Sequence, residues 1–575
     1  MILKKIKPIL LLVGLLGAPA VAQVVPADAQ IKASAQQLVP PFDFPIALSG
    51  NFGELRSNHF HGGLDFKTQG TVNKPVRAQA DGYIQRLRVT HGSGYVLDVV
   101  YENGLSAIYR HLNAFVGEAA RRVEELQYSS ESWEVELEAA PGEYPVKAGE
   151  VMALSGNTGY SFGPHLHLDL FETATGDYID PLPYFASRVN DHTAPRADGI
   201  LLFPKQGGGT VMGGTRAKRF PVHPKQTLTA WGWIGAGIRA YDYMDGIHNR
   251  FGVHTVVLTV DDREVFRSVV DRFSQQEQRY INSWTDGPYM KSVIDPGNRL
   301  RLLHAADAHR GWVLIDEERP YRFVYTLSDA LGNSSQVRFT VHGKRTDIPE
   351  APAGDRLFRY NETNVLQLPG MQLVVPRGML YDDVALQTAL RVDSGDVAYT
   401  YQLHDESVPL HAGCELRIAL RKPLQEVDST KYYVAAVTRT GGRYSVGGRY
   451  EGGLHAEAGC RGSMGPEMVA SIRELGTYTV AVDTVPPVIT PVGRNTWSRT
   501  GRMEFVVKDD ATGVSRYRGE LDGAYALFGK PNLVSGRIVC TFDAQRFAKG
   551  KKHHLRFTAT DGCGNTATYE TEFYY

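Results

Sequence analysis

Residues 94–112, GYVLDVVYENGLSAIYRHL, carry the clearest signal for the fold. Apolar side chains recur at every second position on both sides of Glu102-Asn103-Gly104, which has the composition of a tight turn. A period of two is typical of half-buried β-strands. Similar short runs separated by Gly-rich turns recur from residue 41 to residue 190. We therefore predict one antiparallel β domain over residues 41–190.

Residues 116–145 interrupt this strand pattern. VGEAARRVEEL (116–126) has the apolar spacing of a helix, and the whole segment contains eight Glu residues. PGEYP (141–145) has the composition of a turn or loop and precedes the next predicted strands. The pattern predicts a helical insertion on a β scaffold.

Beyond residue 190, short apolar runs alternate with Gly, Asp, Asn and Pro, and the fold class is predicted to be mainly β. SDALGNSSQVRFTV (328–341) resembles TDGCGNTATYETEF (560–573), which indicates two related β-sandwich modules. Linker-like composition separates the predicted modules, which are an immunoglobulin-like β-sandwich at 196–345, a β-rich module at 357–485 and a C-terminal immunoglobulin-like β-sandwich at 486–575. Asp242 and Asp245, or Asp509 and Asp510, are candidate calcium ligands, although Asp is also common in turns.

The 575 residues have a formal net charge of −1, which gives no electrostatic case for nucleic-acid binding. Residues 1–22 have the pattern of a secretory signal peptide: lysines, a short apolar core and the small-residue site Ala20-Val21-Ala22. Residues 23–40 have the composition of a linker. No run approaches the roughly 20 apolar residues of a transmembrane helix, so no transmembrane anchor is predicted. We expect an exported protein, periplasmic or secreted, with the periplasm preferred by analogy.

The chain contains four cysteines, Cys414, Cys460, Cys540 and Cys563. Export makes disulfides possible, and the pairs 414–460 and 540–563 would each stay within one predicted module. The sequence alone allows three connectivities or free thiols. None of the four lies near the candidate site described next.

Histidines gather in two short motifs that lie far apart. HFHGGLDF (59–66) contains His61 and Asp65, and GPHLHLDL (163–170) contains His165 and His167. On a strand, His165 and His167 would point to the same face about 6–7 Å apart. That spacing suits one histidine on a metal and the other beside a metal-bound water. Zinc accepts imidazole nitrogen and carboxylate oxygen, although His59-Phe60-His61 is also an HxH pair and such a pair alone is weak evidence.

Together with IYRHL (108–112), these motifs resemble the lysostaphin-type (LytM-like) zinc metallopeptidases, which cleave peptide cross-links in bacterial cell walls. The resemblance covers about residues 45–185 and includes PVRAQADGYI, VKAGEVMALSGNTGYSFGPHLHLDL and YIDPLPYF in the family's order. It implies a compact antiparallel sheet of the duplicated-hybrid-motif type with a groove and one zinc ion per chain.

The resemblance also implies a role for each matching residue. His61, Asp65 and His167 are the implied zinc ligands, and His111 and His165 are the implied metal-free catalytic histidines that act as general base or stabilise the oxyanion. His59 matches no family ligand.

Neighbouring residues have milder interpretations. Asn58 and Arg56 either line the groove or hold its loop, and Tyr109 shares a strand face with His111 as groove wall or packing. For Asp169 a solvated position is favoured over a hydrogen bond to a histidine. The 116–145 insertion is either a solvated helix or a lid that restricts the groove.

Three possible functions remain. The first is an exported zinc endopeptidase acting on peptidoglycan peptides, in which the β-sandwich modules space the enzyme or contact an envelope protein partner. The second is a catalytically silent scaffold that binds the wall or activates another hydrolase. The third is an adhesin or envelope-anchoring protein, dominated by the β-sandwich modules, with a peptidase attached. Because all five family positions are present, we favour the enzyme. The sequence does not choose between a D-Ala–diaminopimelate cross-link and a glycine-containing bridge.

Overall fold

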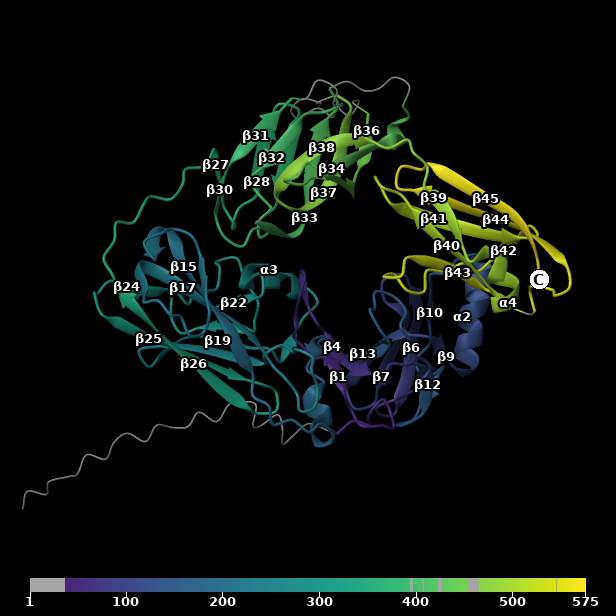
Figure 1. Ribbon diagram of the computed structural model, residues 1–575, viewed down its shortest axis with the longest axis horizontal. Coiled ribbons are helices and arrows are strands. Elements are labelled where there is room, and N and C mark those ends of the chain that lie inside the picture. Colours follow the sequence, from purple (N-terminus) through teal and green to yellow (C-terminus); the bar gives the residue numbers. More distant parts are fainter. Residues whose placement is uncertain (1–36, 393–396, 407, 422–426, 453–464, 544) are drawn as a thin grey trace, which may run out of the picture. The chain divides into compact units, whose positions relative to one another are not determined.

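The computed structural model describes residues 37–392, 397–406, 408–421, 427–452, 465–543 and 545–575 (Figure 1). The predicted signal peptide and Cys460 lie outside these residues. The described chain is mainly β, as predicted, and its paired strands run antiparallel except for β17 and β26. Within the described residues, no helix has the length and apolar character needed to cross a membrane.

A ten-stranded sheet positions the candidate site. Its main path is β1 (Leu48–Gly50), β4 (Gly63–Lys67), β13 (His165–Glu172), β8 (Leu105–Leu112), β7 (Gly94–Tyr101), β6 (Gly82–Thr90) and β10 (Val135–Glu138). Three further short strands join it off this path: β11 (Pro145–Val146) pairs with β6, β14 (Tyr178–Ile179) pairs with β13, and β20 (Arg272–Phe273) pairs with β14. Three small elements of this region form a separate sheet: β5 (Pro75–Arg77), β12 (Val151–Leu154) and β9 (Ala114–Phe115).

The hairpin β7–β8 forms around Glu102–Gly104, as its alternation predicts. Leu97 and Leu112 contribute fully buried side chains to the core of this sheet, together with Leu166 and Leu168 of β13. The intervening residues of β13 face the opposite side. This alternation lets one strand supply both core and site.

The insertion contains a helix and a strand. α2 (Gly117–Ser129) lies where the spacing predicts it and buries Ala119, Val123 and Gln127, which are four residues apart on one stripe. β10 then returns along β6 and extends the main sheet. The surface of this insertion also contacts the C-terminal residues: Glu131 pairs with Arg518 at 2.6 Å, and the Arg546 guanidinium lies 3.5 Å from the centre of the Tyr128 ring.

The next segment forms an eleven-stranded sheet in which the long strand β17 pairs with four others. Its strands are β15 (Arg196–Val211), β16 (Lys218–Phe220), β17 (Leu228–Tyr241), β18 (Thr255–Val260), β19 (Arg263–Val269), β21 (Thr285–Asp286), β22 (Tyr289–Lys291), β23 (Leu303–Ala305), β24 (Val313–Ile315), β25 (Pro320–Ser328) and β26 (Ser334–Gly343). Short helices flank it: η1 (Leu182–Arg188), η2 (Gln278–Tyr280) and α3 (Ile281–Trp284).

Two five-stranded sheets follow, around one hydrophobic core. One contains β28 (Asn364–Leu368), β29 (Met371–Val375), β33 (Pro409–Ala419), β37 (Glu467–Glu474) and β36 (Arg449–Glu451). The other contains β31 (Thr388–Arg391), β32 (Thr400–Leu403), β38 (Gly476–Val482), β34 (Tyr432–Val437) and β35 (Arg443–Gly447), with η3 (Ser429–Lys431) before β34. A separate two-stranded pair consists of β27 (Arg356–Phe358), which precedes β28, and β30 (Val384–Leu386), which lies between β29 and β31 in the chain.

The C-terminal strands form two sheets, of three and four strands. They are β39 (Val488–Val492), β40 (Arg502–Lys508) and β43 (Arg537–Thr541), then β42 (Ala524–Ala526), β41 (Val514–Leu521), β44 (Lys552–Asp561) and β45 (Thr566–Tyr574), with η4 (Arg494–Thr496) and α4 (Trp497–Thr500) between β39 and β40. Cys414, Cys540 and Cys563 are buried free thiols. The candidate pair 540–563 is therefore not formed, and the pair 414–460 involves a residue outside the described ones.

Candidate metal centre

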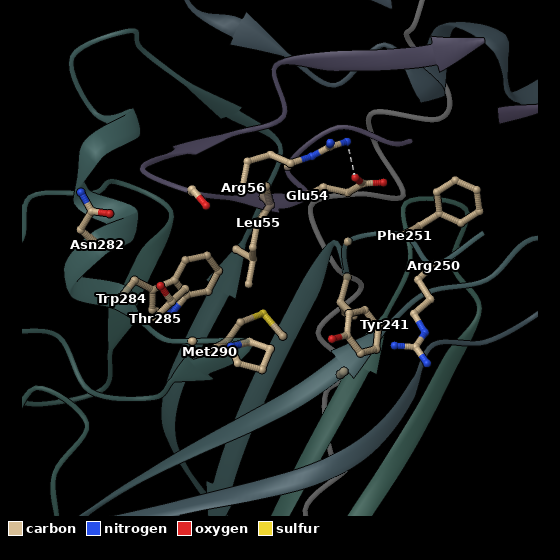
Figure 2. Close-up of a pocket in the computed structure, with 18 of the residues that line it drawn as sticks. Glu54, Leu55, Arg56, Tyr241, Arg250, Phe251, Asn282, Trp284, Thr285 and Met290 are labelled. Atoms are coloured by element: carbon tan, nitrogen blue, oxygen red, sulfur yellow. Dashed lines mark hydrogen bonds and ion pairs between the residues drawn. The ribbon is translucent and has the colours of Figure 1, made fainter. Parts of the chain in front are cut away.

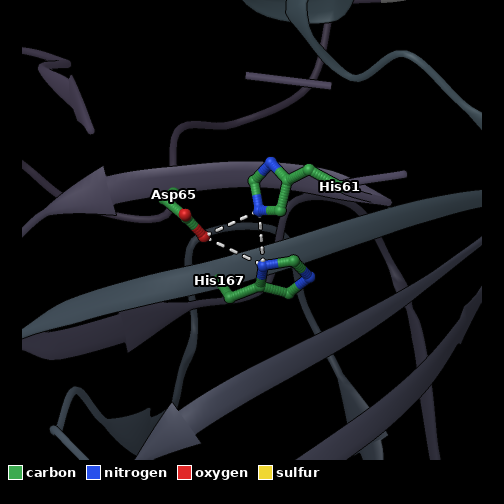
Figure 3. A group of neighbouring side chains, drawn as sticks. All are labelled: His61, Asp65 and His167. Carbon is green, nitrogen blue, oxygen red and sulfur yellow. Dashed lines mark hydrogen bonds and ion pairs between the residues drawn. The ribbon is translucent and has the colours of Figure 1, made fainter. Parts of the chain in front are cut away.

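His61, Asp65 and His167 converge on one point (Figure 3). His61 Nε2 lies 3.0 Å from Asp65 Oδ1 and 3.0 Å from His167 Nδ1, and His167 Nδ1 lies 2.9 Å from Asp65 Oδ1. Two ligands that both lie about 2.1 Å from one zinc ion can be at most about 4.2 Å apart. The three donor atoms therefore fit one ion, and two imidazoles with one carboxylate are a donor set that zinc prefers.

The strand register explains how the motifs meet. β4 and β13 are neighbours, and Asp65 stands directly opposite His167 in an antiparallel pair. Such partners share a face with their Cβ atoms about 4.5–5.5 Å apart. Gly63 allows this close pairing, because a Cβ at that position would lie 1.9 Å from the carbonyl oxygen of Leu168. His61 approaches from the turn before β4.

In each candidate histidine ligand, the ring nitrogen that does not face the shared point is hydrogen-bonded to the protein. His61 Nδ1 lies 2.6 Å from the carbonyl oxygen of Asn51, and His167 Nε2 lies 2.6 Å from Asp169 Oδ1. Donation from these nitrogens leaves the lone pairs of His61 Nε2 and His167 Nδ1 directed at the shared point. Asp169 in turn accepts a 2.8 Å hydrogen bond from Arg110 Nε. The favoured expectation for Asp169 was wrong: its side chain is buried and bonded to His167, because it lies on the inner face of β13.

The charges of this cluster shift its protonation. Burial opposes the charged form of His167, but Asp169 and Asp65 together raise its pKa to about 9. Burial likewise opposes ionisation of Asp65, yet His61 and His167 hold its pKa well below the usual range. Before a metal can bind His167 Nδ1, the proton of the imidazolium must leave.

His111 and His165 flank the triad. Their ring centroids are 4.8 Å apart, and His165 Nε2 lies 3.6 Å from Asp65 Oδ1. His111 Nδ1 donates to the carbonyl oxygen of Thr158 at 2.7 Å, and His165 Nδ1 donates to that of Gly163 at 2.8 Å. Burial lowers both pKa values, to about 3 for His111, so both rings are neutral at pH 7 with Nε2 available as an acceptor.

A backbone kink directs His111 to this face. Simple alternation along β8 would place it with Tyr109, as the sequence suggested. Tyr109 is instead fully buried and hydrogen-bonded to Tyr101, and His111 has a φ of 62° in the left-handed region. That conformation costs a non-glycine residue on the order of 1 kcal/mol, and such strain is common at functional sites.

The loop that carries His61 is anchored outside residues 41–190. Phe52 and Phe60 belong to the same hydrophobic core as the eleven-stranded sheet, with ring centroids 4.9 Å and 5.1 Å from that of Phe273. The side chain of Asn51 also exchanges two hydrogen bonds with the backbone of Gly252, at 2.9 Å and 2.8 Å. The partner that holds His61 is thus fixed by the following segment.

A cavity of about 490 Å³ adjoins this loop (Figure 2). Arg56 and Asn58 line it, with Trp284 and Met290 contributed by the following segment. Arg56 pairs with Glu54 at 2.6 Å and lies 3.6 Å from Asp65 Oδ2. Arg56 therefore both lines the cavity and borders the candidate metal ligands.

The loop before β13 is held by the C-terminal residues. Gly159 donates to the carbonyl oxygen of Pro531 at 2.7 Å and accepts from Leu533 at 2.9 Å. Asn532 Nδ2 donates to the carbonyl oxygens of Asn157 and Ser161, at 2.7 Å and 2.9 Å. This loop ends at His165, so residues 531–533 support its backbone.

Sequence reasoning brought together His61, Asp65, His111, His165 and His167, and the structure places all five side by side. His59 is exposed and outside the cluster, as expected. Asn51, Arg110 and Asn532 were missed. Alternation along β8 would have placed Arg110 on the face opposite to His111, and only the register that sets Arg110 against His167 brings it to the site; Asn51 and Asn532 act through backbone contacts over long sequence separations.

Comparison with known proteins gives matches to proteins named as peptidases. The chain is 33% identical over 116 residues to "DD-carboxypeptidase/endopeptidase Mpg" of Neisseria meningitidis, covering 20% of this chain and 21% of the relative. It is 30% identical over 151 residues to "Glycyl-glycine endopeptidase ALE-1" of Staphylococcus capitis, covering 25% and 32%. The matched region thus spans less than a third of either relative.

A solved structure and a domain family also match. The catalytic domain of lysostaphin from Staphylococcus simulans matches with 23% identity over 24% of this chain and 92% of that chain, at a TM-score of 0.19. The Zu5-like domain family matches residues 355–483. The resemblance to lysostaphin-type peptidases is confirmed by the named relatives, and residues 355–483 are similar to the Zu5-like domain family.

Proposed function

We propose that this chain is an exported zinc metallo-endopeptidase that hydrolyses peptide cross-links of bacterial peptidoglycan. One observation carries the proposal: three donor atoms of His61, Asp65 and His167 meet within about 3.0 Å of one another while hydrogen bonds hold the opposite ring nitrogens. The named endopeptidase relatives support the same reaction class.

His61, Asp65 and His167 would hold one zinc ion per chain. Bound zinc acts as a Lewis acid on a peptide carbonyl and lowers the pKa of water to about 7. Asp169 and the Asn51 carbonyl orient the two imidazoles, and Arg110 keeps Asp169 ionised: although burial opposes ionisation, His167 and Arg110 hold the pKa of Asp169 well below its usual range. Such supporting partners raise ligand basicity and fix the tautomer.

His111 and His165 would be the catalytic bases. Each donates through Nδ1 to a carbonyl, so each Nε2 presents a lone pair rather than a proton. A lone pair at this point accepts a proton from attacking water, and the resulting imidazolium then donates it to the leaving amine. We assign general-base action to this pair, with oxyanion stabilisation once either ring is protonated.

The surroundings suit an extended peptide. Tyr160 and Phe162, which are 60% and 79% exposed, pack against each other on the loop before His165. Exposed aromatic side chains on this loop offer contact surface to a substrate beside the catalytic histidines. Both a D-Ala–diaminopimelate cross-link and a glycine-containing bridge fit this proposal.

We also propose the organisation of the whole chain. A signal peptide at 1–22 and a linker at 23–40 precede the peptidase domain at 41–190, and the modules at 196–345, 357–485 and 486–575 contact an envelope protein partner or space the enzyme from it. Export places the enzyme where the wall is, with the periplasm preferred.

The test compares zinc content and muropeptide release from isolated sacculi for the full chain and four variants. His167→Ala should lose zinc and release, whereas His111→Ala and His165→Ala should keep zinc and lose most release. His59→Ala is the matched control, because His59 is an exposed histidine only two residues from a candidate ligand, and it should keep both.

The second candidate function, a silent wall-binding scaffold, makes a different prediction. Zinc-loaded protein would then pull down with sacculi without releasing muropeptides, and His111→Ala would behave like the unmodified chain. Equal release from unmodified protein and His167→Ala would refute the ligand assignment itself.

A further inference from the structure

Three carboxylates meet near the start of the eleven-stranded sheet. Asp191 lies in the segment before β15, Asp242 directly follows β17, and Asp329 directly follows β25. Each of the three offers an oxygen, and these oxygens all lie within 4.8 Å of one another. The sequence pointed to Asp242 with Asp245, but Asp245 instead pairs with His192 and Thr193.

Two oxygens of this cluster are buried without a hydrogen-bond partner. Asp242 is only 2% exposed, and its Oδ1 is unpartnered, as is Oδ2 of Asp191. Among the described ion pairs, no Lys, Arg or His side chain compensates any of the three charges. Burial, reinforced by the charges of Asp329 and Asp191, raises the pKa of Asp242 to about 8. An uncompensated group of this kind is costly unless a cation or a proton joins it.

The C-terminal sheets contain an equivalent cluster that is closed by hydrogen bonds. Asp483, Asp509 and Asp561 also approach one another within 4.8 Å, and Asp561 occupies the same place in the repeated D-x-x-G-N motif as Asp329. There, the Thr512 hydroxyl donates to Asp483 Oδ2 at 2.7 Å. No buried side-chain oxygen of that second cluster is left without a partner in the part of the chain that the structure describes.

Two sets of donors make the difference. Asp509 Oδ1 accepts hydrogen bonds from the backbone N–H groups of Ala511, Thr512 and Gly513, whereas Asp242 Oδ1 has no partner. Thr512 stands three residues after Asp509, and the residue three after Asp242 is Asp245, which has no hydroxyl to donate. The same scaffold therefore satisfies its carboxylates internally in one copy and leaves two oxygens open in the other. This contrast indicates that the cluster of Asp191, Asp242 and Asp329 binds a ligand that the cluster of Asp483, Asp509 and Asp561 does not need.

We propose that Asp191, Asp242 and Asp329 bind one Ca²⁺ ion. Carboxylate oxygens are the ligands of hard divalent cations, and Ca²⁺ tolerates irregular coordination completed by carbonyls and water. Oxygens that each lie about 2.3–2.6 Å from one Ca²⁺ are at most about 5 Å apart, which the observed limit satisfies.

The ion would fasten the segment before β15 to the loop that follows β17. That loop includes Phe251, which is buried in the core of the ten-stranded sheet, and Gly252, which bonds to Asn51. Because the Asn51 carbonyl holds His61, Ca²⁺ at this place would stabilise the support of the candidate zinc ligand without contacting it.

The test is equilibrium dialysis of ⁴⁵Ca²⁺ against the full chain, kept loaded with one equivalent of zinc, at Ca²⁺ concentrations up to about 5 mM, the range of weak extracellular sites. Asp242→Asn and Asp191→Asn each remove one ligand charge, and both should bind one Ca²⁺ fewer per chain than the unmodified protein. Asp262→Asn is the matched control, because Asp262 is an exposed turn residue of the same sheet, and it should bind as the unmodified protein does.

Near-ultraviolet circular dichroism confirms that each variant is folded, and two ligand variants keep the test decisive if one misfolds. Loss of one bound Ca²⁺ in either folded ligand variant supports the site. No Ca²⁺ bound by the unmodified chain, or equal binding by the ligand variants and the control, would overturn it and mean that Asp242 is protonated instead. The readout does not depend on peptidase activity, so this inference and the proposed function fail separately.

Discussion

Replacing Asp169 by Asn should change zinc affinity in a way that depends on pH. The substitution keeps the shape that accepts a hydrogen bond from His167 and removes the charge that raises its pKa to about 9. Loss of a supporting partner typically weakens metal binding by about 10–100-fold. The same substitution also lowers the pKa of His167, so a proton on this ring competes less with zinc. This second effect favours zinc binding and therefore opposes the first.

The magnitude follows from the pKa. With a pKa of about 9, only about one metal-free molecule in 100 has His167 deprotonated at pH 7, so the proton costs zinc binding about 100-fold there. The raised pKa means that the proton is held below pH 9 and that zinc affinity rises with pH up to that value. In Asp169→Asn the pKa falls toward about 6.5, and the proton penalty at pH 7 almost disappears.

We therefore expect Asp169→Asn to bind zinc within about tenfold of the unmodified chain at pH 7 and about 10–100-fold more weakly at pH 9.5. Competition with a chelating indicator at both pH values measures the ratio. His59→Ala, which leaves the site intact, should give a ratio of one throughout. If the ratio for Asp169→Asn is the same at both pH values, the charge of Asp169 does not control His167 and the reasoning fails.

Three further predictions concern the supports of the site, each measured by urea unfolding of the full chain. Gly159→Ala should destabilise by more than about 1 kcal/mol, because φ is 73° and a Cβ would lie 2.5 Å from the Ser93 backbone; no shift would show that the loop relaxes freely. Asn532→Ala should cost about 1–3 kcal/mol through the two carbonyls it leaves unpaired in loop 157–161, and should speed proteolysis there; unchanged proteolysis would contradict the support. Leu166→Ala should cost about 2–5 kcal/mol as a fully buried side chain, and a smaller cost would mean that the core collapses around the gap.

The strands and the candidate ligands were predictable because both depend on local pattern. Alternation around Glu102–Gly104 gave the hairpin, and the spacing of His165 and His167 placed both on one face. The helix of the insertion follows from apolar positions four residues apart. These features repeat over a few residues and need no knowledge of distant partners.

What escaped prediction depends on contacts between remote segments. The burial of Asp169 could not be distinguished from exposure without knowing that Arg110 stands beside it. The left-handed conformation of His111 reverses the side-chain direction that alternation predicts, so Tyr109 was placed with the wrong neighbours. The insertion was weighed as a solvated helix or a lid, whereas Glu131 and Tyr128 contact Arg518 and Arg546 of the C-terminal segment.

The buried rings of Phe52 and Phe60 show that the region recognised by sequence similarity differs from the unit that packs together. By sequence similarity, the candidate catalytic portion ends near residue 185, where the likeness to lysostaphin-type enzymes ends. By packing, this portion extends beyond that residue, because the rings of Phe52 and Phe60 are buried beside Phe273. A fragment that ends near residue 185 would expose two large apolar side chains in the loop that leads to His61. The segment recognised by sequence similarity is thus shorter than the segment that must be expressed as one piece to keep this loop packed.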